Sequence, residues 1–369
     1  MELVKARPED QEPLLQFYNS VVLPGHVELV IERKEPFDAI YGIQSNDYDT
    51  FVIRDDESKI HGTFTVTYRD GIIDGRFEKI GYITDTRVGS NREALLTWSK
   101  QFLEVLENSQ KERNCKYMFS ILSQEGGKTY NTFLRGRSRI STFPRYHLLR
   151  KFVLVTVNGK LPFLVNPLPS IKIVNADHRI LDKLLDYIRN KSKNKPLSFE
   201  NSNENFLRRL SLWKGLKLED FLVAFDSQGN IVGCVAPWSP VAIQSFQATG
   251  YHGSISSYRN MFAVGSLFGI TRRFPSRNKS LNFKFLSHLF VNNHDIFQAL
   301  LYTSYKQSKK NEFLVYQNFD GDLVTWLPKY FIGWSMPFGL YSIGSESLEN
   351  PSLQPSPLLP APFVEAALI

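Results

Sequence analysis

The spacing of apolar residues changes abruptly within the stretch YITDTRVGSNREALLTW. Its first half suits an extended strand, whereas Leu95, Trp98 and Phe102 recur every three or four residues. That period is typical of one apolar face of a helix. The pattern therefore predicts a strand that passes through the short polar turn GSNRE into a helix over 91–109.

The remainder of the first half alternates between the two periods. A helical pattern over 7–22 is followed by strand-like runs that are punctuated by the turn sequences DDES and RDGIIDG. The predicted elements are a helix at 7–22, three strands between 49 and 88, a strand at 115–122, a short helix at 128–134 and a strand at 147–157.

A proline-rich stretch, NGKLPFLVNPLPS, then interrupts the chain, and the order of elements recurs after it. The later elements are a strand and helix over 171–190, a hairpin with the turn DSQGN, and a strand, helix and strand over 281–318. We expect two copies of one α/β fold, with domains at 1–158 and 169–369 and a linker at 159–168. Two unrelated α/β domains are the alternative. The apolar end of the chain, PFVEAALI, is expected to form a closing strand.

Composition narrows the class of protein. Apolar residues make up 42% of the chain, and no apolar run is long enough to span a membrane. The start MELVKARPED has no apolar core of a secretory signal, and the low cysteine count favours a cytoplasmic protein. Two cysteines exclude a disulfide framework, and the scattered histidines show no metal-ligand spacing, so no metal is expected. The net charge of +7 permits a phosphate-bearing cofactor without requiring one.

The order of strands and helices, with the segments ARPEDQEPLLQFY, FVIRDDESKIHGTFTVTYR, KIGYITDTRV and CKYMFSILSQEGGKTYNTFL, resembles the GNAT superfamily of N-acetyltransferases. FKFLSHLFV resembles the fourth strand of a second copy. The resemblance implies two domains, each with a mixed, mostly antiparallel sheet flanked by helices. It also implies transfer of an acyl group, expected to be acetyl, from acetyl-CoA to an amine of a small molecule or peptide. Neither a membrane nor a nucleic acid is an expected partner.

The resemblance also assigns candidate site residues. Asp85 matches the place of a base and Tyr130 that of an acid, whereas the cofactor contacts fall on Thr86, Arg87, Val88, Ser90, Asn91 and Arg92. The loop of the family that holds the pyrophosphate is shortened here and lacks its glycines. The unpaired N–H groups at the start of the following helix still favour an anion.

Three alternatives remain open. Ser90 and Glu93 fit a capping box, which would use the helix N–H groups and place a carboxylate where phosphate would bind. Loss of the phosphate loop in both copies is compatible with an inactive pair of domains that binds a small molecule or a protein. The basic stretch 135–151, with interleaved aromatic residues, is compatible with a solvated surface, a CoA contact or nucleic-acid binding.

Overall fold

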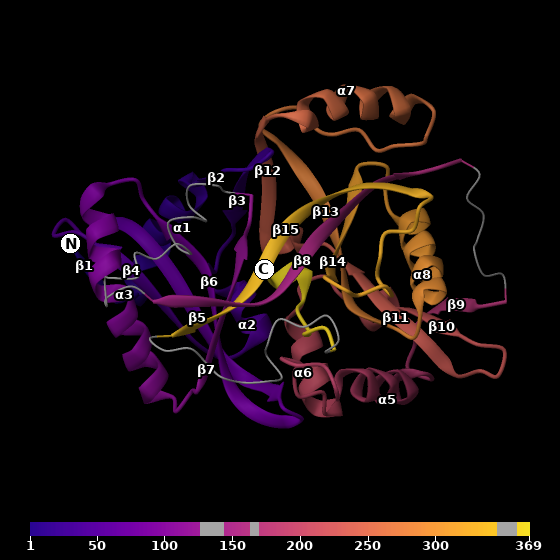
Figure 1. Ribbon diagram of the computed structural model, residues 1–369, viewed down its shortest axis with the longest axis horizontal. Coiled ribbons are helices and arrows are strands. Elements are labelled where there is room, and N and C mark those ends of the chain that lie inside the picture. Colours follow the sequence, from indigo (N-terminus) through magenta and orange to yellow (C-terminus); the bar gives the residue numbers. More distant parts are fainter. Residues whose placement is uncertain (126–143, 163–169, 345–359) are drawn as a thin grey trace.

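A computed structural model describes residues 1–125, 144–162, 170–344 and 360–369. Most strands follow one path across a single large mixed sheet, flanked by helices (Figure 1). The elements of the first half are β1 Glu2–Lys5, α1 Gln11–Ser20, β2 Val22–Leu23, β3 Val27–Arg33, α2 Ala39–Gln44, β4 Asp47–Arg54, β5 Ile60–Ile73, β6 Arg76–Val88, α3 Arg92–Glu112, β7 Tyr117–Ser123 and β8 Arg145–Lys160.

The second half repeats much of this order and adds an excursion through β12 and α7. Its elements are β9 Lys172–Asn175, α5 Leu181–Ser192, α6 Asn203–Leu212, β10 Leu222–Phe225, β11 Ile231–Trp238, β12 Gln244–Tyr251, α7 Ser254–Leu267, β13 Lys279–Val291, α8 His294–Gln307, β14 Glu312–Phe319 and β15 Phe331–Gly344. In each half, an antiparallel hairpin or pair precedes a parallel pair, β6 with β7 and β13 with β14.

The two halves exchange their last strands. β8 pairs with β14 of the second half, and β15 pairs with β7 of the first half as well as with β8. The exchange places β15 and β8 side by side at the centre of the sheet, where Figure 1 shows them crossing between the halves. The sheet is therefore continuous through the seam. The expected division at 159–168 stays a prediction; β8 runs to Lys160, and 163–169 lie outside the described residues.

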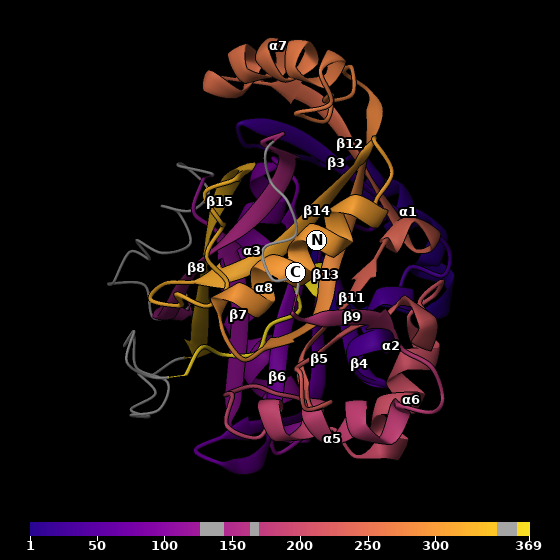
Figure 2. The same cartoon turned by 90° about the vertical axis from the view of Figure 1, so that its right-hand side faces the viewer.

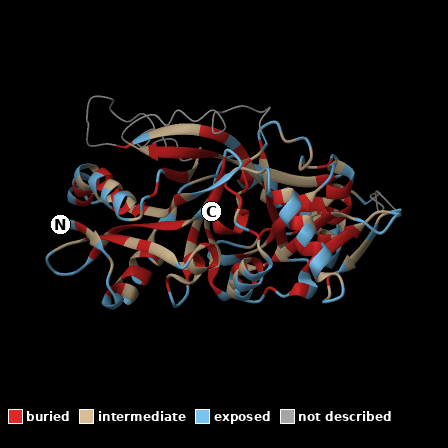
Figure 3. Ribbon diagram, turned by 90° about the horizontal axis from the view of Figure 1, so that it is seen from below, coloured by how far each residue is buried: buried red, intermediate tan, exposed pale blue. Residues whose placement is uncertain are grey.

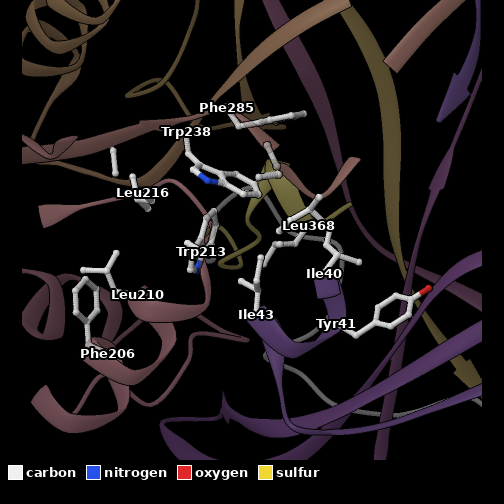
Figure 4. Packing of buried hydrophobic residues seen from close by; sticks show 14 of the residues in the cluster. Ile40, Tyr41, Ile43, Phe206, Leu210, Trp213, Leu216, Trp238, Phe285 and Leu368 are labelled. Carbon is white, nitrogen blue, oxygen red and sulfur yellow. The ribbon is translucent and has the colours of Figure 1, made fainter. Parts of the chain in front are cut away.

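The main apolar core also crosses the seam. Ile40 and Ile43 of α2 lie in one cluster with Trp213 and Trp238 of the second half and with Leu368 (Figure 4). Trp213 and Trp238 meet edge to face with ring centroids 4.7 Å apart. Burial of such large apolar side chains is a principal favourable contribution to folding, so neither half presents this surface to water.

Most predicted elements are present. α3 begins at Arg92, as the change of period at the turn predicted, and β13 contains the stretch FKFLSHLFV. Cys115 and Cys234 are buried free thiols. The predicted helix at 128–134 lies outside the described residues. The predicted C-terminal strand is wrong: residues 360–365 are irregular and Ala366–Leu368 form a single 3₁₀ turn.

Candidate active site

The parallel strands β6 and β7 separate before they end. Their pairing runs from Ile80 opposite Tyr117 to Ile83 opposite Ser120 and goes no further, while β7 continues alongside β15. A cavity of about 370 Å³ opens where the two strands part. This volume lies in the range of small-molecule binding sites. The separation of these two strands thus makes a wedge between them.

A β-bulge lies at the edge of this wedge. On β5, Thr65 pairs with Thr84 and Thr63 with Arg87, so two residues of β6, Asp85 and Thr86, oppose one residue of β5. Asp85 adopts φ +53°, a left-handed conformation that aspartate tolerates better than most residues. A bulge leaves backbone groups unpaired and re-aims the side chains beside it. Both bulge residues line the cavity.

Asp85 is the centre of a buried hydrogen-bond network. Tyr18 of α1 donates its hydroxyl to Oδ1 at 2.6 Å, and Tyr41 of α2 donates to Oδ2 at 2.7 Å. Arg33 of β3 donates Nη2 to Oδ2 at 2.9 Å, and its side chain is only 2% exposed. The guanidinium also lies over the Tyr18 ring. Three donors from three elements thus fix the carboxylate and the bulge that carries it.

This network lowers the basicity of Asp85. Burial by itself would raise the pKa of the carboxyl, but the charges of Arg33 and Arg87 and the two tyrosine hydroxyls outweigh burial, so the pKa lies below its usual value. A carboxylate held in this way is a weak proton acceptor at neutral pH. The contacts are those of a residue that positions the bulge. The ion pair of Asp85 is made with Arg33.

The predicted cofactor contacts divide into two groups. Thr86 and Arg87 line the cavity together with Asp85. The Arg87 guanidinium is buried: Nη1 donates to the Tyr18 carbonyl at 2.7 Å, and the group stacks 3.4 Å from the centroid of the Tyr18 ring. Arg87 therefore supports α1 and does not reach toward the start of α3. Val88 ends β6 outside the lining of the cavity.

The start of α3 is capped by Asn91 and not by Ser90, which the capping-box alternative required. Asn91 is the N-cap, and its Oδ1 accepts from the Glu93 N–H at 2.9 Å. The Glu93 carboxylate turns to the Met1 amino group, 3.1 Å away. The Ser90–Glu93 capping box is therefore wrong. Within the described residues, the N–H groups of Arg92 and Ala94 have no recorded partner, and the Arg92 side chain is exposed.

The cavity is mostly apolar on its other sides. Strands of both halves contribute to it, because β8 and β15 pass beside the wedge and sheet β3–β12 covers it. Its apolar lining includes Leu29, Ile31, Phe246, Phe283, Trp334 and Phe338. Among the described residues, Asp85 and Arg87 are the charged side chains of its lining; Asp85 is paired with Arg33, and Arg87 donates to the Tyr18 carbonyl.

The second half contains a corresponding bulge. β13 and β14 pair in parallel from Asn282 to Phe285, and the register of β13 against β11 shifts between Cys234 and Ala236. His288 lies there with φ +51°, at the position that aligns with Asp85 in the paired stretches FLSHLFV and YITDTRV. Its ring is packed among Phe206, Trp213 and Phe221.

The chain itself fills this second wedge with residues 363–368, which we call the plug. The backbone N–H of His288 donates to the Glu365 carboxylate at 3.1 Å. Gln317 Nε2 of β14 donates to the Val364 carbonyl at 2.7 Å. The Phe363 ring stacks on Phe290 with centroids 5.3 Å apart. The C-terminal end of the chain accordingly lies inside the molecule (Figure 3).

The plug gives a direct prediction about stability. Phe363→Ala removes a buried stacked ring, so we expect the free energy of unfolding to fall by about 3 kcal/mol. Phe77→Ala is the matched control, because Phe77 is 56% exposed, and its effect is expected within about 0.5 kcal/mol. Denaturant unfolding of both variants measures the difference. Equal effects would mean that the plug does not pack in solution as described.

Several parts of the site were not found from the sequence. Tyr18, Arg33 and Tyr41 hold Asp85, yet no spacing pattern links them to it. Tyr130, the predicted acid, lies outside the described residues. No group of three His, Cys, Asp or Glu side chains that could hold a metal occurs in the part of the chain described. No helix among the described residues is long and apolar enough to cross a bilayer.

Comparison with known proteins gives the class of fold. No family model matches the sequence, and no curated protein matches it. Among solved structures, Saccharomyces cerevisiae N-myristoyltransferase with bound myristoyl-CoA superposes with a TM-score of 0.57 at 9% identity, covering 95% of this chain and 83% of that one. A GCN5-related glucosamine N-acetyltransferase region of a fungal multi-domain β-N-acetylglucosaminidase gives 0.57 at 11% identity, covering 92% and 38%. The chain therefore has the fold of GNAT N-acyltransferases.

Proposed function

We propose that the chain is an N-acyltransferase that moves an acyl group from an acyl-CoA to an amine, with acetyl-CoA as the simplest donor. The observation that carries this proposal is the wedge between β6 and β7, with a bulge at its edge and a cavity beyond it. The fold shared with N-myristoyltransferase and with the glucosamine N-acetyltransferase region supports the same class of reaction.

In the proposed reaction, the bulge stabilises the carbonyl group of the acyl-CoA thioester. A thioester placed in the wedge would direct its carbonyl oxygen at the backbone N–H groups near Thr86, which stabilise the negative charge that develops as the amine attacks. The new C–N bond forms as the C–S bond breaks. The amine loses a proton to water, and the thiolate of CoA takes up a proton. Asp85 acts by holding the bulge in place, since its carboxylate already accepts three hydrogen bonds.

The start of α3 is the proposed site for the phosphates of CoA. It follows β6 after a short turn, its first amides carry a partial positive charge, and Arg92 adds an exposed guanidinium. Ser90 and Asn91 form that turn. The corresponding wedge of the second half is filled by the plug. The proposal is therefore one CoA per chain.

Calorimetry with CoA and acetyl-CoA tests this proposal. We expect one molecule bound per chain, with Arg92→Glu weakening binding by about 10- to 150-fold, because a charge-assisted contact to phosphate is worth about 1.5–3 kcal/mol. Arg208→Glu, at an exposed position on α6, is the matched control and should bind like the unaltered chain. No heat and no thermal shift at millimolar ligand would favour the alternative, an inactive pair of GNAT-like units that binds another molecule.

The apolar cavity can be occupied by the acyl chain or by the amine, and experiment can distinguish the two. A two-carbon acyl group occupies little of this cavity, so either a longer acyl chain or an amine with an apolar body fits it better than a small polar amine. Rates with acetyl-CoA and with longer acyl-CoA donors, each against apolar and polar amines, distinguish these pairs. Release of free CoA thiol, measured in each pair, reports turnover directly.

A further inference from the structure

Helix α7 stands out from the body of the protein with apolar residues on its free side. Figures 1 and 2 both show it projecting beyond the end of the sheet. Ile255 and Phe262 face the protein and are buried, whereas Val264, Leu267 and Phe268 are 58%, 81% and 75% exposed. Tyr258 and Met261 extend the same exposed face. This helix is thus apolar both where it packs and where it meets solvent.

The surrounding segment carries positive charge alone. Residues 252–280 contain no aspartate or glutamate, and their basic residues are Arg259, Arg272, Arg273, Arg277 and Lys279. Arg272 is buried and donates to the Tyr305 carbonyl, while Arg273, Arg277 and Lys279 are exposed. At the start of this segment, His252 Nε2 lies 3.1 Å from the Glu28 carboxylate of β3.

We propose that α7 and the basic segment after it dock on the surface of an anionic membrane. The exposed apolar side chains of α7 would lie among the acyl chains, and the exposed cations of the segment that follows it, Arg273, Arg277 and Lys279, would lie at the anionic headgroups. A second copy of this surface would bring like charges together, which disfavours self-association. The proposal departs from the expectation of no membrane partner, and it does not depend on the proposed acyl transfer.

The position of α7 relates this surface to the cavity. Strand β12 contributes Gln244 and Phe246 to the cavity and runs directly into α7. Docking through α7 would therefore hold the mostly apolar cavity at one strand's length from the membrane. An apolar substrate held in the bilayer would then have a short path to the protein.

Sedimentation with vesicles of phosphatidylcholine, with and without phosphatidylserine, tests the proposal on the full chain. We expect binding only to vesicles that contain phosphatidylserine, and weaker binding as salt is raised. The variant Val264→Ser/Leu267→Ser/Phe268→Ser should lose binding. The control Phe77→Ser/Leu95→Ser/Leu96→Ser, which removes three exposed apolar residues elsewhere, should keep it.

Charge is tested separately. Arg273→Gln/Arg277→Gln should weaken binding about 25-fold, from about fivefold for each basic residue lost at the membrane surface. Lys183→Gln/Arg208→Gln removes two exposed cations elsewhere and should leave binding unchanged. Circular dichroism confirms that each variant is folded. Absent binding, equal binding to neutral vesicles, or a dimer that the α7 serine variant dissociates would each overturn the proposal.

Discussion

Asp85→Asn is expected to lower the free energy of unfolding by about 3–5 kcal/mol, although it changes one atom. Asparagine tolerates the left-handed φ of this position, so the backbone is not strained by the change. What is lost is the charge opposite Arg33, whose side chain is only 2% exposed and is therefore shielded from bulk solvent. A buried guanidinium without its carboxylate is the source of the expected loss.

Two further variants isolate this cause. Asp47→Asn is the control, because Asp47 pairs with Lys79 and Arg113 while its own side chain is 42% exposed, and a loss under about 1 kcal/mol is expected. Arg33→Met/Asp85→Asn removes both charges and should be less destabilised than Asp85→Asn alone. If the double variant is as unstable as the sum of the single changes, the ion pair is not the cause.

The same variant tests how Asp85 acts in the proposed reaction. Because the folded pKa of Asp85 lies below its unfolded value near 3.9, its contribution to stability is present above that value and is lost as pH falls through the folded pKa. The stability difference should therefore be constant from about pH 5 to 8.

A positioning residue would change the rate without moving the pH–rate profile. Disappearance of a limb of that profile in Asp85→Asn would instead identify a general base.

Glu365→Gln is expected to stabilise the protein at high pH and to have little effect at low pH. Burial raises the pKa of Glu365 to about 7 from its usual value of 4.5, although the His288 N–H and the charges of Arg209 and Lys195 act in the opposite direction. Below pH 4.5, Glu365 is therefore protonated in both the folded and the unfolded chain, and its ionisation does not affect stability. Between 4.5 and about 7 the unfolded chain releases the proton first, and folding stability is lost as pH rises.

The size of this effect follows from the difference between the two pKa values. Each pKa unit corresponds to about 1.4 kcal/mol, so the carboxylate costs about 3 kcal/mol above pH 7, and the glutamine variant avoids this cost. Glutamine still accepts the His288 N–H through its amide oxygen. Burial lowers the pKa of His288 to about 3, so this ring stays neutral in the folded state across the range and cancels in the comparison.

Urea unfolding of both proteins from about pH 5 to 8.5 measures the prediction. The free energy of unfolding of the variant, relative to that of the unaltered chain, should increase as pH rises from 4.5, the unfolded pKa of Glu365. The increase should level off above about pH 7, the folded pKa. A difference that is flat across the range would show that Glu365 ionises normally. A variant that is less stable at pH 8 would show that the charge of Glu365 is favourable beside Arg209 and Lys195.

The β6–α3 region was predictable because its signals are local. The change of period before Leu95 and the polar turn are both contained in a few residues, and they placed the start of α3 correctly. The sequence left a cap at Ser90 open as an alternative, because Ser and Asn both cap helices well and only the backbone angles decide that Asn91 is the cap. The C-terminal strand was wrong because an apolar octet indicates burial without specifying a partner strand.

The sequence by itself determined the alternation of strands and helices, the bulk of the buried positions and the resemblance to a GNAT acyltransferase, because these depend on patterns a few residues long. Only the tertiary structure decided that Tyr18, Arg33 and Tyr41 converge on Asp85, that β8 and β15 change places, and that the plug fills the second wedge. Such contacts join residues up to hundreds of positions apart. No local pattern records them, since the energy that selects them comes from burial and pairing in the assembled sheet.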